Sequence, residues 1–297
     1  EGYNASIIAY GQTGSGKTFT MNGTESERGV SSRTLKKMFN LLEFKRLEHM
    51  SKQKGREGGV SEFSYSITVS MMEIYNEQVK DLLSDSDGSS SSNEGSTKLD
   101  VRLNPEGEVF VQGLTKHKIQ CIQEVLDLFH HGSTNRMTTA TNLNEHSSRS
   151  HSILVVEVTT AVTNESPLVG KLYLVDLAGS EKVGKSGVTG IAMKEAQNIN
   201  RSLSALGDVM EALDQKSKHV PYRNSALTFL LQNSLCGNAR TMVLVTVCPT
   251  DLTSEETLFT LQFASRIRNI QLGSARKNTN ASMRNLNEQL GSLKNEF

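Results

Sequence analysis

The sequence predicts one α/β layered domain, and two observations lead to that class. Short apolar or alternating stretches typical of strands are interspersed with stretches whose apolar residues recur every three or four positions, as on one face of a helix. The chain has 297 residues, of which 36% are hydrophobic, and at this length that fraction is enough to bury a core. No internal repeat is visible.

The strands and helices can be assigned in order along the chain. Residues 51–61 are polar and Gly-rich and are expected to form a loop. Residues 84–98 are expected to be a disordered surface insertion, because this Ser-rich segment buries too little apolar surface to order itself. The expected strands are 6–10, 63–71, 99–103, 108–111, 153–158, 171–175 and 241–247. The expected helices are 35–42, 122–129, 199–213 and 227–235.

Charge, hydropathy and cysteine content exclude several classes of protein. The chain has 32 basic and 32 acidic side chains, so overall charge does not hold it to nucleic acid. The longest apolar runs, such as Met242–Val245, are too short to cross a bilayer, and no leader pattern for secretion is expected. Cys121, Cys236 and Cys248 are scattered and odd in number. This indicates buried thiols in a reducing compartment, not a disulfide framework or a zinc site.

The most specific chemical motif lies between the first strand and a helix-compatible segment. Its residues are Gly11, Gln12, Thr13, Gly14, Ser15, Gly16, Lys17 and Thr18, which match G-x-x-x-x-G-K-[ST] in full. The glycines of such a loop let backbone N–H groups turn inward around an anion. Lys17 would place its charge on the β- and γ-phosphates of a nucleotide, and the Thr18 hydroxyl would ligate Mg²⁺. The alternative is a Gly-rich turn without a ligand.

Hydrolysis of a bound nucleotide needs two further parts. Asp176 follows an apolar strand in the pattern strand-Asp-x-x-Gly, where it would hold a Mg²⁺-bound water while the Gly179 N–H senses the γ-phosphate. Residues 144–151 form a polar loop that would order water and metal. Taken alone, the first pattern also fits a turn and the second a solvated loop. The guanine-reading element Asn-Lys-x-Asp is absent from the sequence, so ATP is preferred over GTP.

Together, these segments resemble the kinesin motor domain. The matching segments, in family order, are 2–4 with 9–18, 73–77 with 81–83, 144–151, 176–181, 195–200 with 202–207, and 220–225. The ending at 263–268 and 272–276 is similar to the kinesin-14 group, whose members are typically minus-end-directed and several of which come from plants. The resemblance implies a P-loop NTPase fold with a mostly parallel central sheet and helices on both faces. It places the motor domain at 1–272, with the family's first strands missing.

The resemblance also implies a function and residue roles. The function is microtubule-stimulated hydrolysis of Mg-ATP in the cytoplasm, on the microtubule cytoskeleton, without nucleic acid or membrane as partner. Asn144, Ser147 and Ser148 would belong to switch I around the γ-phosphate and Mg²⁺, and Arg149 would form a closing ion pair with Glu181 of switch II. The metal set would be Thr18, Ser148 and, through water, Asp176. The segments at 195–215 and 219–235 would face tubulin.

Two regions leave alternatives open. The chain starts inside the family's domain, and Ala226, Phe229 and Ile191–Ala192 stand where basic residues are usual, so a weakly active or inactive microtubule-binding remnant is the second hypothesis. An unrelated P-loop ATPase is the third. At 273–297, a neck or tail segment spaces Leu286, Leu290, Leu293 and Phe297 in 4-3-4 steps. This predicts a coiled coil and a homodimer, or else a helix packed on its own domain.

Overall fold

The computed structural model describes residues 2–53, 62–84, 99–105, 107–138, 146–163, 165–181, 191–235 and 239–270. Apart from Ser84, the predicted insertion at 84–98 lies outside the described residues, and so does the whole predicted neck segment at 273–297. Asn144 and Cys236 also lie outside them. No helix in the described part of the chain combines the length and apolar character needed to cross a membrane.

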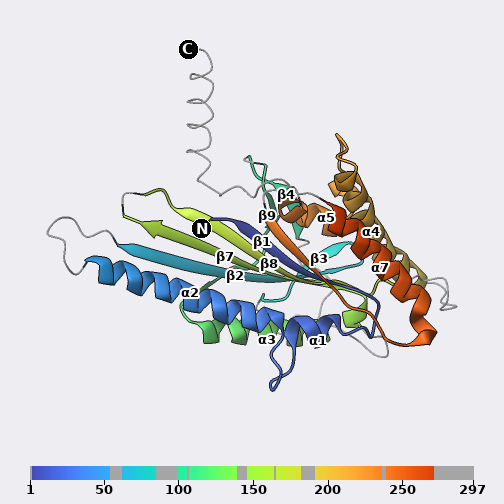
Figure 1. The fold of residues 1–297 in the computed structure, drawn as a ribbon, viewed down its shortest axis with the longest axis horizontal. Helices are drawn as coiled ribbons and strands as arrows, with labels where there is room; N and C mark the ends of the chain where they lie inside the picture. The colour runs from blue at the N-terminus through green and yellow to red at the C-terminus, as the bar shows by residue number, and fades with distance from the viewer. Residues whose placement is uncertain are drawn as a thin grey trace, which may run out of the picture.

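A mixed sheet runs through the middle of the domain, with strand order β3-β2-β7-β8-β1-β9 and β6 pairing with β2 (Figure 1). β1 is parallel to β8 and β9, whereas β2 is antiparallel to β3, β6 and β7, and β7 is antiparallel to β8. The strands are β1 (Asn4–Tyr10), β2 (Phe63–Tyr75), β3 (Gln78–Asp81), β6 (His117–Ile119), β7 (His151–Val162), β8 (Leu168–Asp176) and β9 (Ala239–Val245). The prediction of a mostly parallel sheet is therefore wrong.

Short connections explain the antiparallel pairs. β2 and β3 are joined by Asn76 and Glu77, both with positive φ (53° and 60°), as in the tight turns whose twist suits a hairpin. β7 and β8 are also separated by only a few residues, too few for the crossover that parallel neighbours require. Such connections set strand direction, which hydrophobic periodicity does not report.

Helices cover both faces of the sheet (Figure 1). The first group is α1 (Lys17–Asn22), α2 (Val30–Gln53) and α3 (Ile122–Thr138). The second is α4 (Ile191–Asp214), α5 (Ala226–Leu230), α6 (Gln232–Leu235) and α7 (Ser254–Asn269). Each group shares a hydrophobic cluster with one face: Ile153 packs in the cluster that contains Leu206 of α4, and Leu154 in the one that contains Leu35 of α2. Successive residues of a strand point to opposite faces, so one strand supplies both cores.

Several elements differ from the sequence prediction in extent. The segment at 227–235 forms two short helices, because α5 ends at Leu230 and α6 begins at Gln232. α2 continues through residues 51–53, where a loop was expected. A small hairpin, β4 (Asp100–Leu103) with β5 (Val109–Gln112), agrees with the predicted strands. Cys121 is exposed and Cys248 partly exposed, so the prediction of buried thiols is wrong for both.

α7 was not predicted, and its sequence gives the reason. Thr260 and Phe263 are its only buried residues, and Leu258 and Leu261 are more than half exposed. The apolar stripe that marks an amphipathic helix is therefore weak here. The ring of Phe263 stacks on that of Tyr10 at 3.9 Å between centroids, so α7 is fixed to the end of β1, next to the phosphate loop.

Candidate nucleotide site

The loop of residues 11–18 lies between β1 and α1, as the sequence predicts. Gly16 immediately precedes α1 with φ 92°, a left-handed conformation that glycine adopts without strain. At Gly11, a side chain would collide with the backbone oxygen of Thr246, which follows β9. Ser15 Oγ lies 2.7 Å from the carbonyl oxygen of Gln12 and 2.7 Å from Thr246 Oγ1. The second contact holds the loop against the residue that follows β9.

Lys17 is buried beneath this loop. Its Nζ donates to the carbonyl oxygens of Gly11 at 2.8 Å and Gln12 at 2.9 Å. Burial lowers the pKa of Lys17 from its ordinary value, while the carboxylates of Asp176 and Glu181 oppose that shift. The structure therefore holds a desolvated ammonium group at the position where the sequence predicts a phosphate contact.

Thr18 and Asp176 meet across two neighbouring strands. Asp176 ends β8, which runs parallel to β1, and Thr18 Oγ1 donates to Asp176 Oδ2 at 2.7 Å. Asp176 Oδ1 is buried, and no group in the described residues forms a hydrogen bond with it. Carboxylate and hydroxyl oxygens are the ligands that Mg²⁺ prefers, so this pair and its orphaned oxygen fit the predicted metal. The metal role of Ser148 stays a prediction.

The segment after Asp176 is attached to the phosphate loop and to the polar loop that precedes β7. Gly179 N–H donates to the Ser148 carbonyl oxygen at 2.8 Å, and Ser180 N–H to that of Gly11 at 3.1 Å. The Glu181 carboxylate accepts from the Thr13 N–H at 2.8 Å and from Thr13 Oγ1 at 2.5 Å. A side chain at Gly179 would collide with Glu181 and Thr13, because the segments lie in contact. The pairing of Arg149 with Glu181 stays a prediction.

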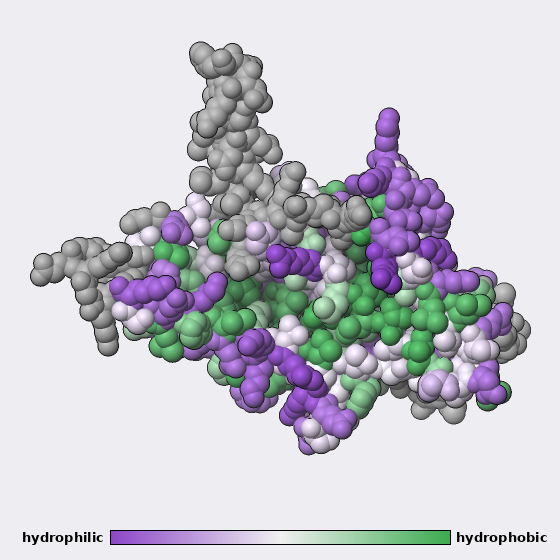
Figure 2. Space-filling model, in the orientation of Figure 1, coloured by the Kyte–Doolittle hydropathy of each residue, from purple (hydrophilic) through white to green (hydrophobic). Residues whose placement is uncertain are grey.

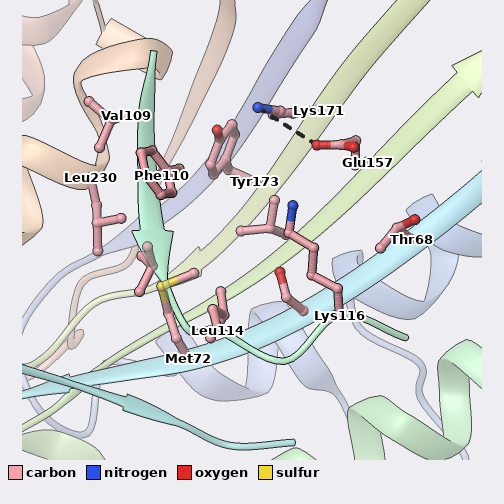
Figure 3. A pocket seen from close by; sticks show the side chains of 13 residues that line it. Thr68, Met72, Val109, Phe110, Leu114, Lys116, Glu157, Lys171, Tyr173 and Leu230 are labelled. Atoms are coloured by element: carbon pink, nitrogen blue, oxygen red, sulfur yellow. Dashed lines mark ion pairs between the residues drawn. The ribbon is translucent and has the colours of Figure 1, made fainter. Parts of the chain in front are cut away.

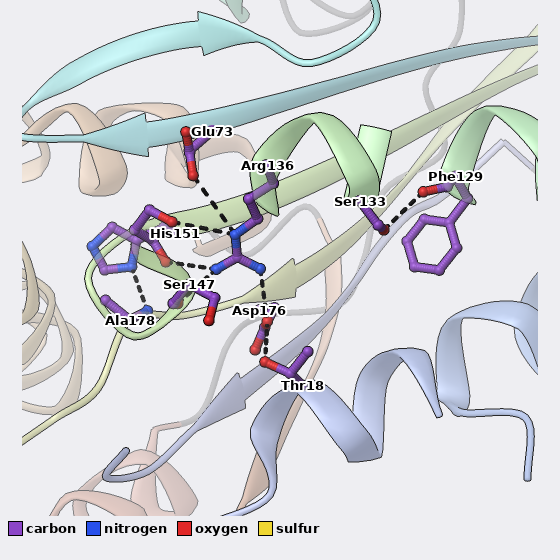
Figure 4. Close-up of polar contacts among 10 residues, drawn as sticks. Thr18, Glu73, Phe129, Ser133, Arg136, Ser147, His151, Asp176 and Ala178 are labelled. Carbon is purple, nitrogen blue, oxygen red and sulfur yellow. Dashed lines mark hydrogen bonds and ion pairs between the residues drawn. The ribbon is translucent and has the colours of Figure 1, made fainter. Parts of the chain in front are cut away.

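Arg136 is a site residue that the sequence analysis missed. It lies in the last turn of α3 and is 5% exposed. Its guanidinium donates to Asp176 Oδ2 at 3.0 Å and lies 3.7 Å from Glu73 Oε1 (Figure 4). Nη2 donates to the carbonyl oxygens of Ser147 and Ser150, each at 2.9 Å. Arg136 thus joins the predicted metal ligand to the polar loop that precedes β7. In the sequence alone, Arg136 stands out only as a basic residue just upstream of that loop.

A separate pocket lies away from the phosphate loop, between the sheet and the β4–β5 hairpin (Figure 3). Its volume is about 110 Å³, and its lining includes Met72, Phe110 and Lys171. Lys171 Nζ lies 3.4 Å from a Glu108 oxygen and 3.7 Å from a Glu157 oxygen, so acidic groups of the chain itself already neutralise its charge. None of the lining residues belongs to the loop at 11–18.

A phosphate loop between a parallel strand and a helix, with an acid at the end of the adjacent strand, defines a P-loop nucleotide-binding domain. Comparison with known families adds the next level. The family described as "Kinesin motor domain" matches residues 1–270, so the chain belongs to the kinesin motor domain family.

Individual relatives and structures agree with that membership. The chain is 47% identical over 278 residues to the kinesin-like protein KIN-14E of Oryza sativa subsp. japonica and 46% identical to KIN-14R of Arabidopsis thaliana, covering 93% of this chain and 24% of each relative. A fast kinesin structure matches with TM-score 0.78 and 41% identity, over 95% of this chain and 74% of that one. The motor domain of Kar3 from Saccharomyces cerevisiae matches with TM-score 0.72 and 36% identity, over 90% and 75%.

The predicted resemblance to kinesin motor domains, with plant kinesin-14 relatives, is confirmed. The chain spans about a quarter of the length of those two relatives.

Proposed function

We propose that this chain is the ATP-hydrolysing part of a microtubule motor of the kinesin-14 type, moving toward minus ends on the microtubule cytoskeleton. The observation that carries the proposal is the double attachment of the phosphate loop, to the last residue of β8 and to the segment after it. Thr18 bonds to Asp176 and Thr13 bonds to Glu181, so the predicted metal ligand and the predicted switch II acid both touch the loop. In our proposal, nucleotide binding rearranges these contacts, which is how nucleotide state would reach the rest of the domain.

The residues of the chain divide the chemistry among them. Lys17 and the inward N–H groups of the loop would hold the phosphates, and Thr18, Ser148 and Asp176 would hold Mg²⁺. Mg²⁺, when bound, neutralises charge on the β- and γ-phosphates. Asn144, Ser147 and Ser148 would order the attacking water, and Gly179 N–H would contact the γ-phosphate after releasing Ser148. The meeting of Arg149 and Glu181 would close the site over the γ-phosphate.

The tubulin-facing surface would be formed by α4 and the segment at 219–235, including the 3-10 turn Tyr222–Asn224 before α5. These elements lie on the opposite face of the sheet from α2 and α3 (Figure 1). Arg223 is exposed there, as are Lys216 and Lys218 in the connection between the two elements. Arg223 also lies over the ring of Phe229, 5.5 Å from its centroid. Since tubulin presents an acidic surface, we expect binding to weaken as salt is added.

Glu181→Ala is expected to leave ATP binding intact and to impair turnover strongly. The substitution removes the carboxylate that contacts Thr13 and, in our proposal, pairs with Arg149 to order the attacking water. Binding is measured with a fluorescent ATP analogue, and turnover by phosphate release. The charge swap Arg149→Glu with Glu181→Arg should recover part of the turnover. Equal loss of binding and turnover, without recovery by the swap, would show that Glu181 only supports the structure.

A microtubule-binding remnant with little activity is the second candidate, and the outer edge of β9 favours it. β9 is the last strand of the described sheet, and Met242 on it is 57% exposed. Figure 2 shows hydrophobic surface gathered over the region that β9 occupies in Figure 1. Such an unpaired edge invites association with a further strand. Microtubule binding without stimulated hydrolysis would favour this candidate.

A further inference from the structure

His151 bonds to two segments that are far apart in the sequence. It is the first residue of β7 and is 2% exposed. Its Nδ1 accepts a hydrogen bond from the Ala178 N–H at 3.0 Å, and its Nε2 lies 2.8 Å from Ser202 Oγ. Ala178 comes two residues after Asp176, and Ser202 lies in the middle of α4. Figure 4 shows the imidazole ring beside the cluster of Arg136 and Asp176, with the Ala178 contact drawn.

The hydrogen bonds around this ring fix its protonation. Ser202 Oγ donates its one proton to the Ile199 carbonyl oxygen at 2.7 Å, so it can only accept from His151. Nδ1 accepts from a backbone N–H and therefore carries no proton. The ring is thus neutral, with its proton on Nε2. Burial, aided by the charges of Arg136 and Lys17, lowers its pKa to about 3 and keeps it neutral at physiological pH.

The neighbours of Ala178 have other partners. Leu177 N–H donates to Ala9 on β1 at 3.3 Å, Gly179 N–H to Ser148, and Ser180 N–H to Gly11 in the phosphate loop. Those three bonds attach the segment to the nucleotide side of the domain, whereas the Ala178 bond leads through His151 to α4. A shift of the segment therefore changes the distance between Ala178 N and the ring. Loss of this hydrogen bond would cost free energy, because it would leave a buried polar group without its partner.

We propose that His151 is a positioning residue that transmits movement of the segment 176–181 to α4 through the bonds Ala178–His151–Ser202. The proposal rests on the proposed function, because the movement is the response to nucleotide and α4 is the surface that faces tubulin. His151 itself touches neither nucleotide nor microtubule. Loss of this connection should separate the two activities, because stimulation by microtubules should fall by more than hydrolysis without microtubules.

Two substitutions interrupt the connection at different atoms. His151→Asn keeps an acceptor near the position of Nδ1 and removes the Nε2 donor, and Ser202→Ala removes the acceptor on α4. Ser133→Ala is the matched control: Ser133 Oγ also donates to a carbonyl of its own helix, Phe129 at 2.8 Å, but it lies on α3. Each protein is assayed for phosphate release with and without microtubules and for its thermal midpoint.

We expect both variants to lose about tenfold more of the rate with microtubules than of the rate without them, the order expected for one buried hydrogen bond. The double variant His151→Asn with Ser202→Ala should lose no more than either single variant, since both interrupt one connection. Ser133→Ala should retain full stimulation. Unchanged stimulation in Ser202→Ala, or a parallel fall of both rates with the thermal midpoint, would overturn the proposal.

A second readout keeps this test separate from that of the proposed function. If the wild-type chain shows no stimulation by microtubules, the proposed function fails, and the connection is measured by hydrogen exchange of α4 amides with and without ATP. The proposal then predicts that ATP changes exchange in α4 of the wild type and of Ser133→Ala, and that Ser202→Ala lacks this change. The same change in all three proteins would contradict it, and so would its absence from the wild type.

Discussion

Lys17→Ala is expected to abolish ATP hydrolysis, with a loss of at least about a hundredfold, the scale on which removal of one preorganised charge contact slows a reaction. The ammonium group is buried and held by the carbonyls of Gly11 and Gln12, so its charge is preorganised at the loop before any phosphate arrives. Alanine leaves the backbone cradle without that charge. Phosphate release over a range of ATP concentrations measures the effect.

Lys36→Ala provides the control for this substitution. Lys36 is exposed on α2, so its removal deletes the same charge from the protein without touching the loop. Its rate should equal that of the wild type. Hydrolysis that persists unchanged in Lys17→Ala would remove the basis for assigning residues 11–18 to phosphate binding.

Arg136→Met is expected to destabilise the domain by about 3–5 kcal/mol, because it removes a buried cation from the two buried carboxylates beside it. Glu73 is fully buried and Asp176 nearly so, and the guanidinium lies against both. It also donates to two backbone carbonyls, which methionine cannot replace. The free energy of unfolding in urea measures the loss.

Two further variants test whether the loss of stability in Arg136→Met comes from the loss of its buried charge. Adding Glu73→Gln to Arg136→Met should restore part of the lost stability, since it removes the charge of one of the two carboxylates that lose the guanidinium. Arg102→Met breaks a pair whose side chains are 55% and 52% exposed, and it should have little effect. If Arg136→Met were as stable as the wild type, the buried cluster would not hold the acid of β8 in place.

The sequence predicts the parts of the site that depend on local pattern. The phosphate loop and Asp176 each follow an apolar strand, and the chain places them as expected because β1 and β8 are adjacent and parallel. Arg136 escaped prediction because its role depends on three separate segments meeting: α3, the end of β8, and β2 with Glu73. The sequence places His151 in the polar loop at 144–151 but does not predict its bond to α4, since its partner Ser202 is 51 residues away.

The fold was predictable to a similar degree. Most strands and helices appear where hydrophobic periodicity predicts them. Strand direction depends on the connections between strands, which hydrophobic periodicity does not predict. The turn at Asn76 and Glu77 is the clearest example, because two consecutive left-handed residues reverse the chain and make β2 and β3 antiparallel. The predicted coiled coil and homodimer involve residues outside the described part of the chain and stay predictions.

The most direct test of the account is phosphate release from ATP by the wild-type chain at rising microtubule concentrations. If the loop, the segment 176–181 and α4 work as proposed, the rate should rise with microtubules and saturate, and added salt should shift saturation to higher microtubule concentration. A rate that stays flat while the chain sediments with microtubules would contradict the account and identify a binding protein without motor activity.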